Sequence, residues 1–148
     1  MADLLANKAK LAALMRVDGA SVDLVDKYVL TATNPQAADV ILLMRIPAGS
    51  QLTRLRLFAD DLDTGTTLVF SVGYRAVSSS SSLAASAAYF AAAGQTVGQA
   101  GGALECAFKP IVFEEDVYIT VTIGTAGAGT NTGDELIGIA TVNMNGPK

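Results

Sequence analysis

The sequence predicts an all-β protein, an antiparallel jelly-roll sandwich of about eight strands with a short N-terminal arm or helix. Three observations support this fold class. Apolar and polar residues alternate with a period of two through most of the chain after residue 19, turn residues separate these segments at nearly regular intervals, and little of the chain has helical spacing. Eight short strands of this kind form a closed sandwich or barrel, and the jelly roll is the eight-stranded double-sheet version.

Length and composition fit one domain with a filled core. The chain has 148 residues, of which 51% are hydrophobic and 16% charged. Its net charge is −4 and its ten basic residues are dispersed, so we expect no nucleic-acid partner. No apolar run reaches the roughly 18 residues of a membrane-spanning helix, so we expect no membrane partner. Cys106 is the single cysteine, which excludes an intrachain disulfide and fits synthesis in the cytoplasm.

Residues 1–19 are predicted to be a separate N-terminal arm, and residues 20–148 the β-sandwich domain. Helical spacing in the arm connects Leu4, Leu5, Lys8, Leu11, Ala12 and Met15. The turn signal Asp18-Gly19 ends this pattern, and the period of two begins after it. The alternative is that residues 1–19 form a short helix that packs on the β-sandwich of the same chain.

Seven segments have the composition or alternation of strands, and an eighth is weaker. They are 25–33, 39–46, 51–58, 67–75, 103–109, 116–124 and 135–144, with 20–24 as the weaker one. The clearest alternation occurs in 67–75 and 116–124. It predicts a core that contains Phe70, Val72, Tyr74, Ile119, Val121 and Ile123.

The segment 78–102 is of low complexity and is predicted to contain a loop and some helix. Its serines suit a loop or a helix cap, and "LAASAAYFAAAG" is expected to form one or two helical turns that Gly94 ends. Tyr89 and Phe90 are accordingly expected outside the strands.

The stretch "DDLDTG" at 60–65 resembles the start of a calcium-binding loop but is predicted to be a turn. An EF-hand loop needs oxygen ligands at positions 1, 3 and 5, glycine at 6 and glutamate at 12. A loop starting at Asp61 has Gly65 at position 5 and Val72 at position 12, and one starting at Asp60 has Leu62 at position 3. Neither frame fits, so we expect no metal site.

No set of residues suits catalysis or a cofactor. The chain has no histidine, which removes the commonest general base and zinc ligand. The glycines of 127–133 do not follow a nucleotide-binding pattern, and no G-K-[ST] sequence occurs. Glu114, Glu115 and Asp116 are consecutive in a predicted turn, and Cys106 alternates with core residues, so neither forms a plausible catalytic group. We expect no enzymatic activity, cofactor or catalytic residue.

The order of these segments resembles a known family. The pieces that carry the resemblance are "IPAG" at 46–49, "DDLDTG" followed by "VGY", "TVGQAGG" at 96–102, the predicted pair of strands around "FKPIVFEEDVYITVTIG", and the closing "TGDELIGIATVNM". This pattern, over residues 20 to 144, is similar to the small capsid decoration (cement) proteins of tailed bacteriophages, which are jelly-roll-like. None of the pieces carries chemistry, so the resemblance depends on their order.

The resemblance implies a structural protein of the virion. Such proteins bind the outer surface of the phage head, commonly as homotrimers, and stabilise contacts between major capsid subunits. The arm then becomes the candidate contact with the capsid or with a neighbouring subunit, through Leu4, Leu5, Leu11, Leu14, Met15 and Arg16. Two alternatives remain: a receptor- or carbohydrate-binding module of a phage tail or fibre, and an enzyme on a β-sandwich.

Overall fold

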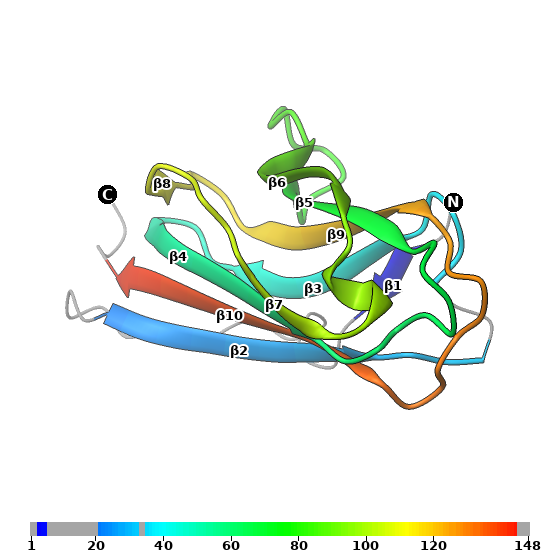
Figure 1. The fold of residues 1–148 in the computed structure, drawn as a ribbon. Coiled ribbons are helices and arrows are strands. Elements are labelled where there is room, and N and C mark those ends of the chain that lie inside the picture. The colour runs from blue at the N-terminus through cyan, green and yellow to red at the C-terminus, as the bar shows by residue number, and fades with distance from the viewer. Residues whose placement is uncertain (1–2, 6–20, 33–34, 145–148) are drawn as a thin grey trace.

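The computed structural model describes residues 3–5, 21–32 and 35–144 and shows two β-sheets packed face to face (Figure 1). The all-β, antiparallel sandwich predicted from the sequence is confirmed. Sheet A has the strand order β1-β3-β9-β5-β6. Sheet B has the order β2-β10-β4-β7, and the short strand β8 also pairs with β4.

The strand bounds follow the predicted segments closely, with some added strands. Sheet A consists of β1 (Asp3–Leu5), β3 (Val40–Ile46), β9 (Val117–Thr125), β5 (Val69–Ala76) and β6 (Ser86–Gln95). Sheet B consists of β2 (Ser21–Val29), β10 (Glu135–Met144), β4 (Ser50–Ala59), β7 (Gly102–Glu105) and β8 (Ile111–Val112). A single helical turn, η1 (Val97–Gln99), precedes β7. Within the described ranges, no helix has the length and apolar character needed to cross a membrane.

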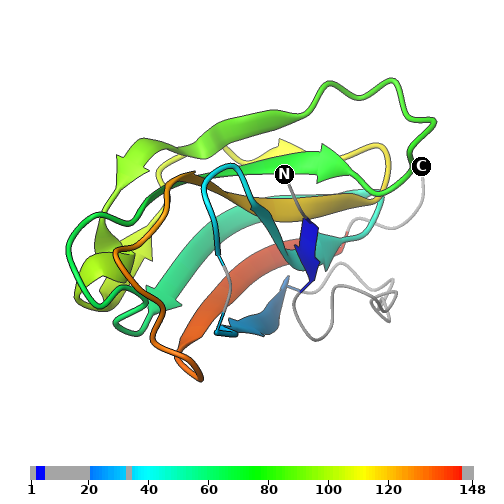
Figure 2. The same ribbon diagram turned by 90° about the vertical axis from the view of Figure 1, so that its right-hand side faces the viewer.

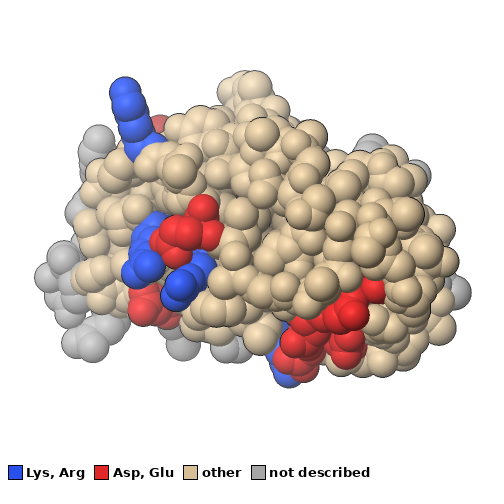
Figure 3. Space-filling model, in the orientation of Figure 1, with Lys and Arg blue, Asp and Glu red and all other residues tan. Residues whose placement is uncertain are grey.

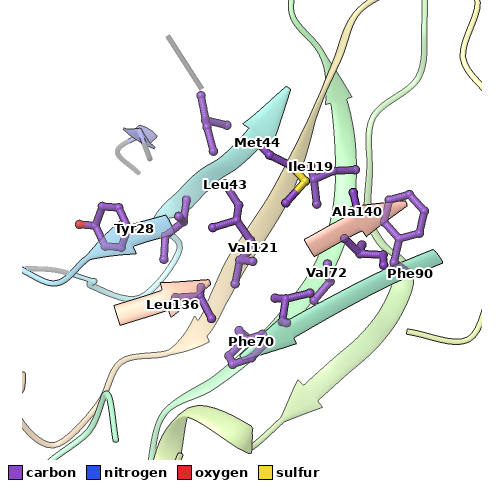
Figure 4. Packing of buried hydrophobic residues seen from close by; sticks show 14 of the residues in the cluster. Tyr28, Leu43, Met44, Phe70, Val72, Phe90, Ile119, Val121, Leu136 and Ala140 are labelled. Atoms are coloured by element: carbon purple, nitrogen blue, oxygen red, sulfur yellow. The ribbon is translucent and has the colours of Figure 1, made fainter. Parts of the chain in front are cut away.

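The core lies between the two sheets and is filled by the alternating residues (Figure 4). The register pairs Phe70 with Ile123, Val72 with Val121, and Tyr74 with Ile119, so all six project from one face of sheet A. Five of them are buried as predicted and Tyr74 is half-buried. From sheet B, residues such as Leu136 and Ala140 close the core.

A bulge in β3 places two consecutive buried side chains against sheet B. Leu42 pairs with Thr120 and Met44 with Ile119, so Leu43 is an extra residue in the strand, and both Leu43 and Met44 are buried. Opposite them on β10 is Gly138. A Cβ atom at that position would lie 2.5 Å from Met44 Cε and 2.7 Å from Leu43 Cδ2. The glycine therefore provides the space that the two side chains occupy.

Two sequence predictions about individual elements are wrong. The stretch predicted to contain helical turns forms β6, an edge strand of sheet A, and Tyr89 and Phe90 lie in it rather than in a loop. Hydrogen bonding to β5 overrides the helix propensity of its alanines. The segments 20–24 and 25–33, predicted separately, form the single strand β2.

The N-terminal segment begins as a strand rather than with the helical spacing expected. β1 pairs in parallel with β3, Leu4 aligning with Ile41 and Leu5 with Leu42, and Leu4 packs against the core. β1 and β2 belong to different sheets (Figure 2). The described start of the segment therefore lies at the edge of sheet A, whereas Leu11, Leu14, Met15 and Arg16 lie outside the described residues.

Candidate binding surfaces

The Asp63 carboxylate joins two loops at one end of the sandwich. It is buried and accepts hydrogen bonds from the backbone N–H groups of its own loop: Gly65 (3.0 Å), Thr67 (2.8 Å) and Leu68 (2.9 Å). From the loop between β9 and β10 it accepts the N–H groups of Ala128 (2.7 Å) and Gly129 (3.4 Å). The stretch 60–66 is thus a turn organised by one buried side chain, as predicted.

These hydrogen bonds keep Asp63 ionised. Burial alone would raise the pKa of its carboxyl, but the N–H groups of Leu68, Gly65, Thr67 and Gly129 stabilise the carboxylate more strongly and lower the pKa well below its ordinary value. Because the oxygens are already saturated by N–H donors, they are poorly available to a cation. In the part of the chain that the structure describes, no group of three or more potential metal ligands occurs.

Around this junction lies an acidic end of the sandwich, formed by Asp60, Asp61, Asp134 and Glu135. Backbone contacts hold the group together: Asp60 N–H donates to the Glu135 carbonyl at 3.0 Å, and Glu135 N–H donates to Asp60 Oδ2 at 2.9 Å. The Asn131 side chain donates to the Asp61 carbonyl at 2.6 Å. Figure 3 shows an acidic group at the lower edge of this view.

The outer face of sheet B carries an apolar patch. On β10, the inward residues are Leu136, Gly138, Ala140 and Val142, so Ile137 and Ile139 project outward. Residues paired with these two share their face. The sheet B patch comprises Val25 and Val29 of β2, Phe58 of β4, and Ile137 and Ile139 of β10.

None of the five residues of the sheet B patch belongs to the core cluster. Val25 is 45% exposed, more than any other large hydrophobic residue in the described ranges, and the other four are partly exposed. Exposed apolar side chains that gather on one face often mark a protein–protein contact.

Charged residues lie on the same outer face as the sheet B patch, since the register pairs Lys27 with Ile137 and Arg56 with Ile139. Lys27 binds Glu135, and Arg54 and Arg56 share Glu105. Asp23 accepts a hydrogen bond from the Thr141 hydroxyl at 2.6 Å. These ion pairs are exposed and each contributes only about 0–1 kcal/mol to stability. Charges of both signs therefore share this face with the apolar side chains.

A second exposed surface belongs to β6 and has no charge. No Asp, Glu, Lys or Arg occurs between Arg75 and Glu105, and most β6 side chains are exposed. Tyr89 is 41% exposed and packs edge-on against Tyr74, at 5.3 Å between ring centroids. Much of the upper part of the molecule in Figure 3 is correspondingly free of charged side chains.

The carboxylates considered as catalytic candidates have structural partners. The Asp116 side chain accepts the Ala48 N–H at 2.7 Å and pairs with Arg45, joining two adjacent turns. Glu115 accepts the Ser81 hydroxyl at 2.5 Å. Cys106 is buried, as predicted, and burial followed by the nearby charge of Glu105 raises the pKa of its thiol to about 11. A thiol with this pKa is a poor nucleophile at neutral pH.

Of the predicted contact residues, Leu4 and Leu5 are placed at the edge of sheet A by β1. The sequence reasoning did not identify the sheet B patch. The signal was present in the alternation of β10, where both the inward and the outward positions are apolar, but only the strand order shows that β2 and β4 add further apolar residues beside it.

The structure is similar to solved structures over nearly the whole chain. A chain in a structure titled "Capsid of Ralstonia phage GP4" is 21% identical, with a TM-score of 0.77 and coverage of 99% of each chain. The fold occurs in phage capsids. A chain in "Cyanophage Pam1 capsid asymmetric unit" is 19% identical, with a TM-score of 0.62 and coverage of 91% of this chain and 94% of that one.

A third match has lower similarity. A chain in "Acidic stable capsid structure of Helicobacter pylori bacteriophage KHP30" is 12% identical, with a TM-score of 0.54 and coverage of 86% of this chain and 94% of that one. No protein-family model and no curated protein matches the sequence. The resemblance to phage capsid proteins that the sequence suggested is therefore confirmed at the level of the fold.

Proposed function

We propose that the chain is a structural, non-enzymatic protein of a tailed-phage virion that binds the outer surface of the head and stabilises contacts between major capsid subunits. The observation that carries this proposal is the match to a chain of the Ralstonia phage GP4 capsid structure, which extends over 99% of both chains. A fold retained over 99% of both chains at 21% identity indicates a shared architecture. The order of sequence motifs that resembles decoration proteins supports the outer position.

The proposal includes self-association as a homotrimer. Decoration proteins of the family that the sequence resembles are commonly trimeric. Trimers that bridge several capsid subunits gain affinity because each contact raises the effective concentration of the next. The exposed apolar sheet B patch and the uncharged β6 surface offer area for such contacts.

The N-terminal segment is proposed to be the contact with the capsid or a neighbouring subunit. Leu4 and Leu5 fix its start beside β3, and Leu4 also packs on its own core. The contacting side chains are then mainly Leu11, Leu14, Met15 and Arg16. A double variant, Leu11→Asp and Met15→Asp, is expected to fold and melt like the wild type but to lose binding to heads.

The test of the proposed function starts from purified virions. Mass spectrometry should find the chain in stoichiometric amount relative to the major capsid protein. Heads that lack the chain should bind the added purified protein and withstand heating better afterwards, and cryo-electron microscopy should show it on the outside. Absence from virions and failure to bind heads would refute the proposal. If a glycan array instead gave specific binding, the tail or fibre module would become the better assignment.

A further inference from the structure

We infer that β6 is the surface through which copies of the chain meet around the axis of a homotrimer, with Tyr89 of one subunit packed on Ala92–Gly94 of the next. The inference rests on the proposed homotrimer. A ring of three requires a heterologous contact, in which two different elements of each subunit fit each other, because a self-complementary surface produces two-fold pairs. Such a contact therefore needs one element that projects and one that receives it.

β6 exposes two short runs of residues, Ala87–Tyr89 and Ala92–Gly94, which together are called the β6 surface. The register against β5 pairs Ser86, Ala91 and Gln95, and surplus residues of β6 lie between these positions. Bulges of this kind leave the surplus residues outside the ladder, so both runs are available to a neighbour. An edge this irregular is a poor template for strand addition, and we therefore assign the contact to side chains.

The β6 surface lies in a stretch without charge. None of the 29 residues between Arg75 and Glu105 is charged, whereas 16% of the whole chain is. β6 and the loop before it form the upper margin of the molecule in Figures 1 and 2, and Figure 3 shows a broad uncharged area there. Glu115 contacts this stretch through the Ser81 hydroxyl, in the loop before β6, and so marks one limit of the surface. Burial of the β6 surface therefore takes none of its own groups out of water as ions.

The absence of charge favours a second copy of the chain as the partner. Around a rotation axis each residue lies near its own copies, so a charged residue there lies near like charges, which repel. A contact with a different protein has no such restriction, because opposite charges on the two sides attract. The sheet B patch is less suited to this position, since Lys27, Arg56 and Glu105 share its face and removal of ions from water is costly.

The two runs of the β6 surface differ in the way that a ring of three requires. Tyr89 is 41% exposed, and edge-on contacts hold its ring against Tyr74 and Phe90, at 5.3 and 5.1 Å between centroids. A tyrosine held in this way buries a large area with little further loss of freedom. The other run has no side chain beyond Cβ, and a Cβ added at Gly94 would meet nothing within 4 Å. Tyr89 therefore supplies the projecting element, and Ala92–Gly94 supplies a low surface that receives it.

The test uses full-length variants that disable one element each. Tyr89→Asp removes the projecting ring, and Ala93→Asp places a charge on the receiving run. Tyr89→Phe keeps the ring, and Thr132→Asp adds the same charge in an exposed loop between β9 and β10. Circular dichroism and thermal melting establish that each variant is folded. Ala93 is exposed and does not pack on the core, so its variant decides the question even if Tyr89→Asp does not fold.

Light scattering after size-exclusion chromatography measures the association. At micromolar concentration the wild type, Tyr89→Phe and Thr132→Asp should have about three times the chain mass of 15.2 kDa. Tyr89→Asp and Ala93→Asp should each weaken the association about tenfold or more, as loss of a central interface residue does. An equimolar mixture of these two should form a complex of two chains, because one intact ring meets one intact receiving run. Added salt should leave the wild-type association intact, since screening acts on charges.

Other results overturn the inference. A monomeric wild type at micromolar concentration would do so, as would an Ala93→Asp variant with the wild-type mass or a mixture that contains only single chains. Association that weakens strongly with salt would assign the contact to a charged face such as that of sheet B. If Tyr89→Asp keeps the wild-type mass and instead loses binding to a glycan array, Tyr89 serves a carbohydrate. If the variants behave as expected but the chain is absent from virions, the proposed function fails and the subunit contact stands.

Discussion

Gly73 of β5 packs against the backbone of Ser86 at the start of β6. A Cβ atom at Gly73 would stand 1.8 Å from the Ser86 carbonyl oxygen and 2.5 Å from the carbonyl carbon of Ala87. Both are backbone atoms, so no side chain can rotate away to make room. The absence of a side chain at this one position allows β6 to lie across β5 and complete sheet A.

The first prediction concerns this contact. Gly73→Ala should destabilise the protein by about 3 kcal/mol or displace β6, since overpacking against backbone typically costs 1–3 kcal/mol or more. Gly124→Ala is the matched control, because its added Cβ would meet only ordinary contacts at 3.5 Å or more. Urea denaturation measures both. A Gly73→Ala variant as stable as the control would show that β6 does not hold this position.

The second prediction concerns the buried carboxylate that joins the loops. Asp63→Ala leaves at least five backbone N–H groups without their acceptor, and we expect a loss of about 3 kcal/mol or more. Asp61→Ala, at an exposed position two residues earlier, should change stability by less than about 0.5 kcal/mol. Equal effects of the two substitutions would contradict the role given to Asp63.

The third prediction is the pH dependence of the same site. The pKa of Asp63 is lowered in the folded state, so its contribution is complete above the unfolded-state pKa of about 3.9 and is lost as the pH falls below it. The free energy of unfolding of the wild type should therefore decrease between about pH 4 and pH 2. Asp63→Asn should show a shallower decrease over this range, and parallel curves would rule out the assignment.

A fourth prediction tests the register of the core. Val121→Asp places a charge between the sheets, where the residue is fully buried, and should cost several kcal/mol, comparable to the total stability of many domains. Thr125→Asp, exposed at the end of the same strand, is the control. The Val121 variant should be insoluble or melt far below the wild type. A soluble variant with an unchanged melting temperature would invert the assignment of inner and outer faces.

The fifth prediction concerns Cys106. Because it is buried and the pKa of its thiol is raised to about 11, a thiol reagent at pH 8 should modify the native protein very slowly. In denaturing urea the same reagent should react rapidly with one thiol per chain. Rapid reaction of the native protein would show that the segment around Cys106 opens readily.

Alternation was sufficient to predict the strands whose inward residues are apolar and whose other face is mostly polar or small. β5 and β9 follow this pattern, and their inward residues were assigned from the sequence. β6 was not recognised because most of its side chains are exposed on both faces and Phe90 is its one buried residue. Without a buried face there is no period of two, and its alanines favour helix by intrinsic propensity.

The candidate surfaces were less accessible to sequence reasoning. The sheet B patch combines residues from three strands that are remote in the chain, and their adjacency follows from β10 lying between β2 and β4. Asp63 was recognised as part of a turn, but its contacts with Ala128 and Gly129 depend on two loops meeting at the same end of the sandwich. Local sequence carries no information about contacts between loops that are distant in the chain.

The central position of β10 also has a consequence for synthesis of the protein. β10 is the last strand described, yet it pairs with β2 on one side and β4 on the other. During translation β2 and β4 emerge long before the strand that connects them, so sheet B remains incomplete until the C-terminal region leaves the ribosome. Nascent chains then expose two unpaired strand edges, which favours aggregation on crowded polysomes. A premature stop codon ahead of residue 135 would remove the shared neighbour of both strands, and such a fragment should be degraded or precipitate instead of folding in part.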